Sequence, residues 1–190
     1  MTRRRRILLV TILLLAVAAL LTPLIYRRVK HHTFLHAAVA RGDVGLARLL
    51  LALGASPNSR DNYAFTPLHR AAATGNVKMV RLLLAKRADV NAKSIKSQTP
   101  LHFAASAGKA DVAHLLLNEG GDPNIMTSSE YDTPLMYAVH HGNENVARVL
   151  LQHGADPNAK HPGYPTALSV ALQQGNESLA KLLRQYGGKE

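Results

Sequence analysis

The sequence contains no cysteine and no tryptophan, and aromatic residues make up only 5% of its 190 positions. Without cysteine, the chain forms no disulfide bond, has no thiolate nucleophile and holds no cysteine-bound zinc. Acidic residues are also scarce, with 12 Asp and Glu against 23 Lys and Arg. Nucleic-acid binding needs a basic stripe or stacking aromatic side chains. The few aromatics argue against that class of function.

The positive charge is concentrated at one end of the chain. Seven basic residues lie within the first 30 positions, and the first acidic residue is Asp43. From residue 31 onward the sequence has 16 basic and 12 acidic residues, so the body is only mildly basic. The basic excess therefore belongs to an N-terminal segment that differs in character from the rest.

A long apolar run lies inside that segment. From Ile7 to Tyr26, only two threonines and one proline interrupt 20 residues. Twenty helical residues span about 30 Å, the thickness of a bilayer's hydrocarbon core. We therefore predict a transmembrane anchor over 7–26, with a basic tail over 1–6 before it and a basic juxtamembrane linker over 27–32 after it.

A cleaved signal peptide is the alternative interpretation of the same run. Ala16, Val17 and Ala18 provide small residues at the spacing of a cleavage site. Cleavage there leaves an exposed apolar end, "ALLTPLIY", and we favour the uncleaved anchor. Four arginines precede the span, and positive residues stay in the cytoplasm. We expect a single-pass protein of the inner or plasma membrane, with a cytoplasmic N-terminus and an extracytoplasmic body, periplasmic in a Gram-negative bacterium.

The body is built from internal repeats, which three markers reveal independently. A threonine recurs every 33 or 34 residues, a glycine follows each threonine by nine positions, and an asparagine follows the first four by 25. The markers are Thr33, Thr66, Thr99, Thr133 and Thr166; Gly42, Gly75, Gly108, Gly142 and Gly175; and Asn58, Asn91, Asn124 and Asn158. Repetition at such a period indicates stacked structural units.

One unit shows the local physics. Thr66 is suited to cap a helix, and Pro67 fits the first helical position, where no backbone hydrogen bond is lost. Gly75 ends that helix in a left-handed turn, and "NVKMVRLLLAK" has the apolar spacing of a second helix. Each unit is therefore helix, turn, helix and loop. Since one unit cannot bury its apolar face alone, the copies must stack.

The chain resembles the ankyrin repeat family, in a bacterial type with an N-terminal anchor or signal segment. The resemblance is carried by "TPLH" at 66–69 and 99–102, "TPLM" at 133–136 and "GADPN" at 154–158. It implies an all-α solenoid of about five repeats after one N-terminal transmembrane helix. The repeats would be residues 33–65, 66–98, 99–132, 133–165 and 166–188. It also implies that His36, His69 and His102 brace neighbouring loops through hydrogen bonds.

Several positions depart from the family pattern. The loop glycine is replaced by Ala64, Ser97, Tyr131 and Tyr164, so we expect less regular loop tips. Four of the five turns after the second helix have glycine, and the remaining one has Arg87. Repeat one has Phe34 in place of proline, and repeat five has Arg184 where the others have leucine, which suits a water-facing cap.

The sequence offers no convergent set of ionisable groups for catalysis, so we expect no enzyme activity and no cofactor. A metal site is the sharpest rival hypothesis. His32 and His36 stand one helical turn apart, and His140 and His141 are adjacent. Neither pair has a third ligand in the sequence pattern, and a zinc site needs at least three protein ligands. We therefore expect no metal site.

The resemblance implies a concave binding surface, made of loop tips and the exposed side of the first helices. The candidate protein-binding residues are Arg60, Asp61, Tyr63, Lys93, Ile95, Lys96, Met126, Glu130, Lys160, His161 and Tyr164 at the tips, and Arg70, Thr74, Phe103, Tyr137, His140 and His141 on the first helices. Tyrosine and arginine often anchor interfaces. For Phe103 and Tyr137, filling interior space is an equally open role.

The sequence therefore predicts a membrane-anchored module that binds a partner protein on its concave surface. Its contacts would be that protein and, through residues 7–26, the lipid bilayer, without nucleic acid and with a monomeric repeat body. The alternative is a periplasmic inhibitor or immunity-type protein, secreted or anchored, that occludes an enzyme with the same surface.

Overall fold

A computed structural model describes residues 32–130 and 132–190, and these residues form helices and loops without a β-strand. Residues 32–40 are helical, and nine further helices follow within the described part. Their bounds are α2 (Val44–Ala52), α3 (Pro67–Thr74), α4 (Val77–Ala85), α5 (Pro100–Ser106), α6 (Ala110–Asn118), α7 (Pro134–His140), α8 (Glu144–Gln152), α9 (Ala167–Gln173) and α10 (Glu177–Gln185).

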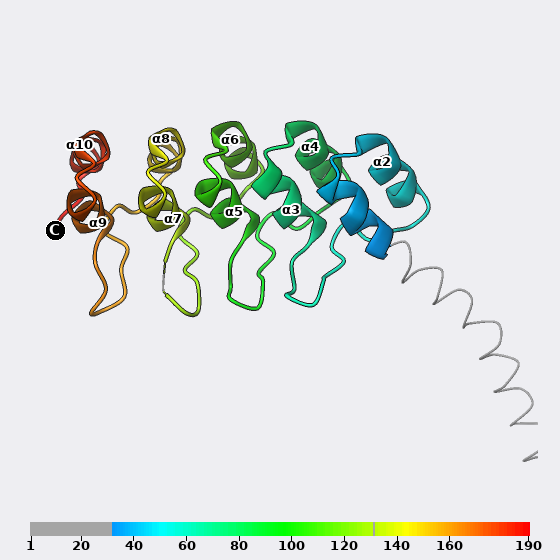
Figure 1. The fold of residues 1–190 in the computed structure, drawn as a ribbon, viewed down its shortest axis with the longest axis horizontal. Helices are drawn as coiled ribbons and strands as arrows, with labels where there is room; N and C mark the ends of the chain where they lie inside the picture. Colours follow the sequence, from blue (N-terminus) through cyan, green and yellow to red (C-terminus); the bar gives the residue numbers. More distant parts are fainter. Residues whose placement is uncertain (1–31, 131) are drawn as a thin grey trace, which may run out of the picture.

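The helices form two layers along the long axis of the molecule (Figure 1). The first helices of the repeats (α3, α5, α7 and α9) make one row, and the second helices (α2, α4, α6, α8 and α10) make the other. Long loops project together from the row of first helices. The chain is therefore the predicted stack of helix-turn-helix-loop units, and its loops form one side.

The helix boundaries follow from the capping chemistry of the repeat. Thr66 and His69 form a capping box at the start of α3, where Pro67 takes the first helical position. Gly75 ends α3 in the left-handed conformation at φ 76°, and the Asn76 side chain accepts a hydrogen bond from Met79 N to begin α4. A glycine is needed at this sharp turn because other residues rarely adopt positive φ.

Repeat one begins differently from the other four. Residues 32–40 are already helical, so Thr33 lies within a helix and does not cap its start. The predicted boundary between a linker at 27–32 and a repeat at 33 therefore does not coincide with the beginning of this helix. Phe34 replaces the proline that marks the first helical turn in repeats two to four, and it leaves a backbone N–H available to a longer helix.

The recurring asparagines join neighbouring repeats. Asn58 Nδ2 donates to the carbonyl oxygen of Arg87, and its Oδ1 accepts from Asp89 N, at 3.1 and 2.7 Å. The other three repeat this arrangement one unit further on: Asn91 with Gly120 and Asp122, Asn124 with Gly154 and Asp156, Asn158 with Gly187 and Lys189. The asparagine marker is thus a clamp between successive layers.

Within residues 32–130 and 132–190, three residues other than glycine adopt positive φ: Ala64 at 59°, Arg87 at 62° and Ser97 at 60°. Ala64 and Ser97 occupy the place of the family's loop glycine, and their turns are closed by bonds from Ala64 N to Asp61 O and from Ser97 N to Ser94 O. The expectation of less regular tips is therefore wrong for these two loops. The side chains are accommodated at the cost of backbone strain.

The two ends of the stack differ in polarity. In repeat five, Arg184 is exposed where Leu51, Leu117 and Leu151 are buried, as the sequence predicted for a polar cap. At the other end, Leu46 and Leu49 of α2 and Leu53, which caps its C-terminus, are exposed. Among the described residues, no helix has the length and apolarity to cross a membrane. The predicted anchor at 7–26 lies outside the described residues.

Candidate protein-binding surface

The loop tips of successive repeats are held together by backbone hydrogen bonds. Ile95 N donates to Tyr63 O at 3.1 Å, and Ser128 N donates to Lys96 O at 3.0 Å. Arg60 Nη1 reaches the carbonyl oxygen of Lys93 at 2.6 Å and adds a side-chain link between the first two tips. These bonds fix the spacing of the tips, so side chains from different repeats form one surface.

Two apolar side chains stand exposed on adjacent tips. Tyr63 is 66% exposed and Ile95 is 67% exposed, although each is large enough to favour burial. The exposed ammonium groups of Lys93 and Lys96 stand on the same tip as Ile95. An apolar centre with a charged rim is the composition of a protein-protein interface.

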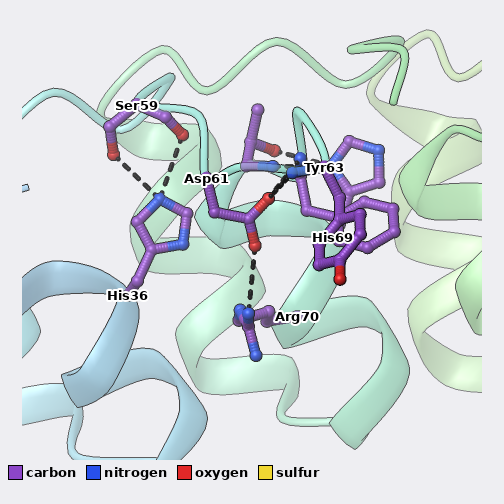
Figure 2. Close-up of polar contacts among 8 residues, drawn as sticks. His36, Ser59, Asp61, Tyr63, His69 and Arg70 are labelled. Carbon is purple, nitrogen blue, oxygen red and sulfur yellow. Dashed lines mark hydrogen bonds and ion pairs between the residues drawn. The ribbon is translucent and has the colours of Figure 1, made fainter. Parts of the chain in front are cut away.

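Asp61 organises the base of the first tip, as Figure 2 shows. Its Oδ1 accepts hydrogen bonds from Tyr63 N and Phe65 N, and its Oδ2 lies 3.0 Å from Arg70 Nη2. Partial burial raises the pKa of the carboxyl, but the two amides and the guanidinium outweigh it and hold the pKa below its ordinary value. Asp61 therefore stays charged and positions the Tyr63 backbone.

An open hollow of about 660 Å³ adjoins this tip at the N-terminal end of the concave side. Four of the predicted site residues line it, namely Arg60, Asp61, Tyr63 and Arg70, together with His32, Thr33, His36, Ser56, Ser59 and Asn62. The structure thus gathers residues from repeats one and two into one depression beside the exposed Tyr63.

Phe103 and Tyr137 fill interior space rather than project outward. The Phe103 ring packs edge-on against Phe65 at 5.0 Å between centroids and against His69 at 5.5 Å. Tyr137 is partly buried, packs on His102, and its hydroxyl accepts a hydrogen bond from Gln98 Nε2 at 2.7 Å. Burial raises the pKa of the Tyr137 hydroxyl. Both rings join neighbouring repeats.

The other first-helix candidates are exposed but engaged. Thr74 Oγ1 donates to Ala71 O within its own helix. His140 Nε2 lies 3.6 Å from Asp132 Oδ2, a carboxyl whose pKa burial raises despite the nearby imidazole. His141 contacts Tyr137 O and Ser106 Oγ through its two ring nitrogens. These residues form a polar edge of the concave side.

The remaining tips continue the row toward the C-terminus. Glu130 and Lys160 are exposed, Met126 is half-buried, and His161 packs edge-on against Tyr164 at 5.8 Å between ring centroids. Tyr164 is 42% exposed, less than Tyr63. The large exposed apolar groups among the predicted tip residues are therefore concentrated on the first two tips.

His69 and His102 brace neighbouring repeats as the resemblance implied. Their Nε2 atoms lie 3.0 Å from Gln98 O and 3.2 Å from Asp132 O, and each Nδ1 accepts a hydrogen bond from the threonine N–H three residues earlier. Burial lowers the pKa of each imidazole to about 4, so both are neutral near pH 7.

His36 is placed differently because its repeat lacks the threonine cap. Its Nε2 lies 3.1 Å from Ser59 O, and its Nδ1 is buried without a hydrogen-bond partner. Burial lowers the pKa of His36 as well. Repeat one has the threonine and histidine of repeats two and three, with Phe34 in place of proline, but its His36 Nδ1 accepts no hydrogen bond from the threonine N–H.

Metal ligation has no structural cluster to support it in the described part of the chain. Across residues 32–130 and 132–190, no group of three His, Cys, Asp or Glu side chains is placed to hold an ion. His32 Nδ1 accepts a hydrogen bond from Ser56 N, and His36 Nε2 is taken up by Ser59.

Sequence reasoning missed Phe65 and Gln98, which organise the surface from behind. The Phe65 ring contacts the rings of Tyr63, His69 and Phe103. Gln98 donates a hydrogen bond from Nε2 to the Tyr137 hydroxyl, and its carbonyl oxygen bonds to His69 Nε2. Both residues directly precede a cap threonine. Their shared place, directly before the threonine that begins a first helix, was the signal in the sequence that could have identified them.

The chain was compared with known proteins. A family model described as ankyrin repeats, in three copies, matches residues 9–94 and 92–161. No curated protein matches the chain. The first matched segment begins inside the apolar run at 7–26 and ends within the second loop tip, before Ile95, which the second segment includes.

Proposed function

Because the chain belongs to the ankyrin repeat family, we propose that it is a protein-binding module whose principal contact surface is the first two loop tips. The observation that carries the proposal is the pair of exposed apolar side chains, Tyr63 and Ile95, on tips joined by the bond from Ile95 N to Tyr63 O. This bond fixes the relative positions of the two tips in the free protein, which lowers the entropy cost of ordering them on binding.

The partner's chemistry follows from the charges around this centre. Lys93 and Lys96 are exposed beside Ile95, whereas Asp61 is tied to Arg70 and to two backbone amides. The surface therefore presents net positive charge around apolar anchors. It suits a folded protein with an apolar pocket and an acidic rim, since complementary charges favour encounter and specificity.

The proposed role is non-enzymatic. The ionisable side chains around the hollow serve structural contacts: Asp61 holds Arg70, and His36 bonds to Ser59. Catalysis needs a base and an acid or nucleophile that converge on one reacting atom. The engagement of these groups in structural contacts supports a binding role without catalysis.

The proposal includes a membrane anchor over residues 7–26, with the repeats outside the cytoplasm. It is supported by the apolar length of that run and by the four arginines before it. A reporter active only outside the cytoplasm, fused after Glu190, should be active, and the protein should remain with membranes after a high-salt wash. Activity only from a cytoplasmic reporter contradicts the orientation. Release of a shorter soluble species supports a cleaved signal instead.

Site-specific photocrosslinking tests the binding surface. A photoreactive residue at Ile95 should give one discrete crosslinked species in cells, whereas the same residue at Lys78, exposed on α4 away from the tips, should not. The crosslink should disappear when Tyr63 is changed to Ala. Equal crosslinking from both positions, or a crosslink indifferent to Tyr63, contradicts the proposal.

A further inference from the structure

Leu46 and Leu49 of α2 are exposed at positions that are buried in the later repeats, apart from Val149 of repeat four, which is partly buried. Leu46 is 36% exposed, while its counterparts Met79, Val112, Val146 and Leu179 are at most 1% exposed. Leu49 is 55% exposed, while Leu82, Leu115 and Leu182 in the same register are at most 8% exposed. In repeat one, apolar side chains of the kind that later repeats bury are therefore exposed.

The missing cover is on the N-terminal side of repeat one. Among the described residues no further repeat packs on repeat five, yet its Leu179 and Leu182 are buried. These positions must therefore be covered by the preceding repeat and not by the following one. Phe34 obeys the same rule, since it is 53% exposed whereas Pro67, Pro100, Pro134 and Ala167 are buried.

A third leucine extends this apolar end beyond what stacking requires. Leu53 is 50% exposed at a position where later repeats have Lys86, Glu119, His153 and Tyr186. Leu46, Leu49 and Leu53 are spaced at i, i+3 and i+7 and therefore lie on one side of the helix. We call these three residues the proximal leucine face. Three exposed leucines on one side of a helix form a patch that a water-facing end does not need.

The chain outside the described residues limits what can lie near this face. The predicted span ends at Tyr26, and helix 32–40 follows after five residues. Even fully extended, six Cα–Cα steps reach only about 20 Å. Arg27, Arg28 and Lys30 lie in this short tether, and Arg41 and Arg48 are exposed on either side of the turn that begins α2.

We propose that the proximal leucine face lies against the bilayer surface, with the leucines at the acyl-headgroup boundary and the arginines among lipid phosphates. The proposal rests on the anchor assigned to residues 7–26. Exposed leucines close in sequence to the exposed Arg41 and Arg48 have the composition of interfacial membrane contacts, in which apolar side chains enter the acyl boundary and basic ones meet the phosphates. Asp43 is the acidic residue at the start of α2. Its carboxylate accepts a hydrogen bond from Leu46 N as the helix cap, so it is engaged by the backbone.

This contact fixes the orientation of the solenoid. Repeat one would be membrane-proximal, repeat five distal, and the row of tips would face sideways along the membrane plane. A partner would then be engaged parallel to the bilayer, first by the tips nearest to it.

Fluorescence quenching tests the proposal, because the native chain has no cysteine and each introduced thiol is unique. The full chain carrying Leu53→Cys, with an environment-sensitive dye, is reconstituted into vesicles containing anionic lipid. The matched control is Tyr186→Cys, the same register position in repeat five and 40% exposed. A lipid-borne spin-label quencher and aqueous iodide report on the two surroundings.

The expected result is loss of most Leu53→Cys emission to the lipid-borne quencher with little loss to iodide, and the reverse for Tyr186→Cys. Equal iodide quenching at both positions overturns the proposal. Protection of position 53 from both quenchers also overturns it, because protein then covers the face, either residues 1–31 or a second copy. Flotation separates the failure of the anchor from the failure of the bilayer contact. Protein that floats with the vesicles but shows strong iodide quenching at position 53 refutes the bilayer contact alone. Vesicles that float without protein refute the anchor and, with it, the bilayer contact.

Discussion

His69 Nε2 lies 3.0 Å from the carbonyl oxygen of Gln98, the last residue before the next repeat's cap threonine. The same ring accepts Thr66 N–H at its other nitrogen, so one imidazole joins a helix start to the neighbouring layer. The arrangement needs the neutral tautomer with hydrogen on Nε2, because Nδ1 must remain an acceptor.

Acid should therefore destabilise the stack before it titrates the carboxylates. His69 and His102 have pKa values of about 4 in the folded chain because they are buried, against an ordinary 6.5. Between these pH values the unfolded chain binds more protons, so the free energy of unfolding falls as the pH falls through this window. Urea unfolding at pH 7, 5.5 and 4.5 measures the effect.

Repeat four supplies the matched variant, since it has Met136 at the histidine position. His102→Met should be less stable at pH 7 but should lose up to about 3 kcal/mol less than the wild type on acidification. Identical pH profiles for the two proteins would show that His102 does not carry the dependence.

Arg87→Gly should stabilise the protein. Arg87 has φ 62° at a position where the other four repeats have glycine at positive φ. Relief of left-handed strain, less glycine's greater freedom when unfolded, should give up to about 1 kcal/mol in chemical unfolding. The Asn58 bond to the carbonyl oxygen of residue 87 is retained, because it involves only the backbone there.

Gly120→Ala is the reciprocal control. Gly120 has φ 86°, and a Cβ built there meets no atom within 4 Å, so any loss of stability reports the backbone conformation alone. We expect a loss of about 1 kcal/mol. Stabilisation by Gly120→Ala, or destabilisation by Arg87→Gly, would refute the strain explanation.

Ala64→Gly and Ser97→Gly should each stabilise the loops for the same reason. Both residues have φ near 60° in turns closed by backbone hydrogen bonds. The expected gain is a few tenths to about 1 kcal/mol in thermal or urea unfolding. Ala85→Gly, in the exposed last turn of α4, should instead cost about 0.5–1 kcal/mol. A loss of stability in the loop variants comparable to that of the helix control would contradict this.

Changing Tyr63 and Lys96 together to Ala should weaken partner binding by a few kcal/mol, if Tyr63 is an anchor of the kind that dominates interfaces. Folding stability should hardly change, since both side chains are exposed. The matched control removes the same residue types elsewhere: Tyr186→Ala with Lys78→Ala, on the second helices. Calorimetry or surface plasmon resonance with the crosslinked partner measures both. Equal affinity of the two double variants refutes the tip surface.

The features that the sequence predicted well are local ones. Thr-Pro caps, glycine turns and the apolar spacing of the second helices determine the backbone within a few residues, so the repeat and its helices could be read directly. Register alone identified Arg87 as the residue that replaces a turn glycine, and the structure shows that its backbone is left-handed. Thr33 shows the limit: it keeps the register of the cap threonines, but it lies inside the helix over residues 32–40.

The candidate site was harder to predict because exposure depends on neighbours. Phe103 and Tyr137 face the same side as the binding residues, yet Phe65 and Gln98 of adjoining segments enclose them. Asp61 was a candidate protein-binding residue at a tip, but its oxygens accept hydrogen bonds from two backbone amides and Arg70. Such pairings join residues from two elements and leave no periodic trace in the sequence.

The asparagine clamps give the solenoid a mechanical character. Each of Asn58, Asn91, Asn124 and Asn158 closes the same two bonds onto the next layer, and the last one closes on Lys189 N, one residue from the C-terminus. Under tension along the long axis, every junction therefore resists with the same pair of bonds. Extension should therefore be shared among the four junctions that these asparagines close, with none of them weaker than the others in this pair of bonds.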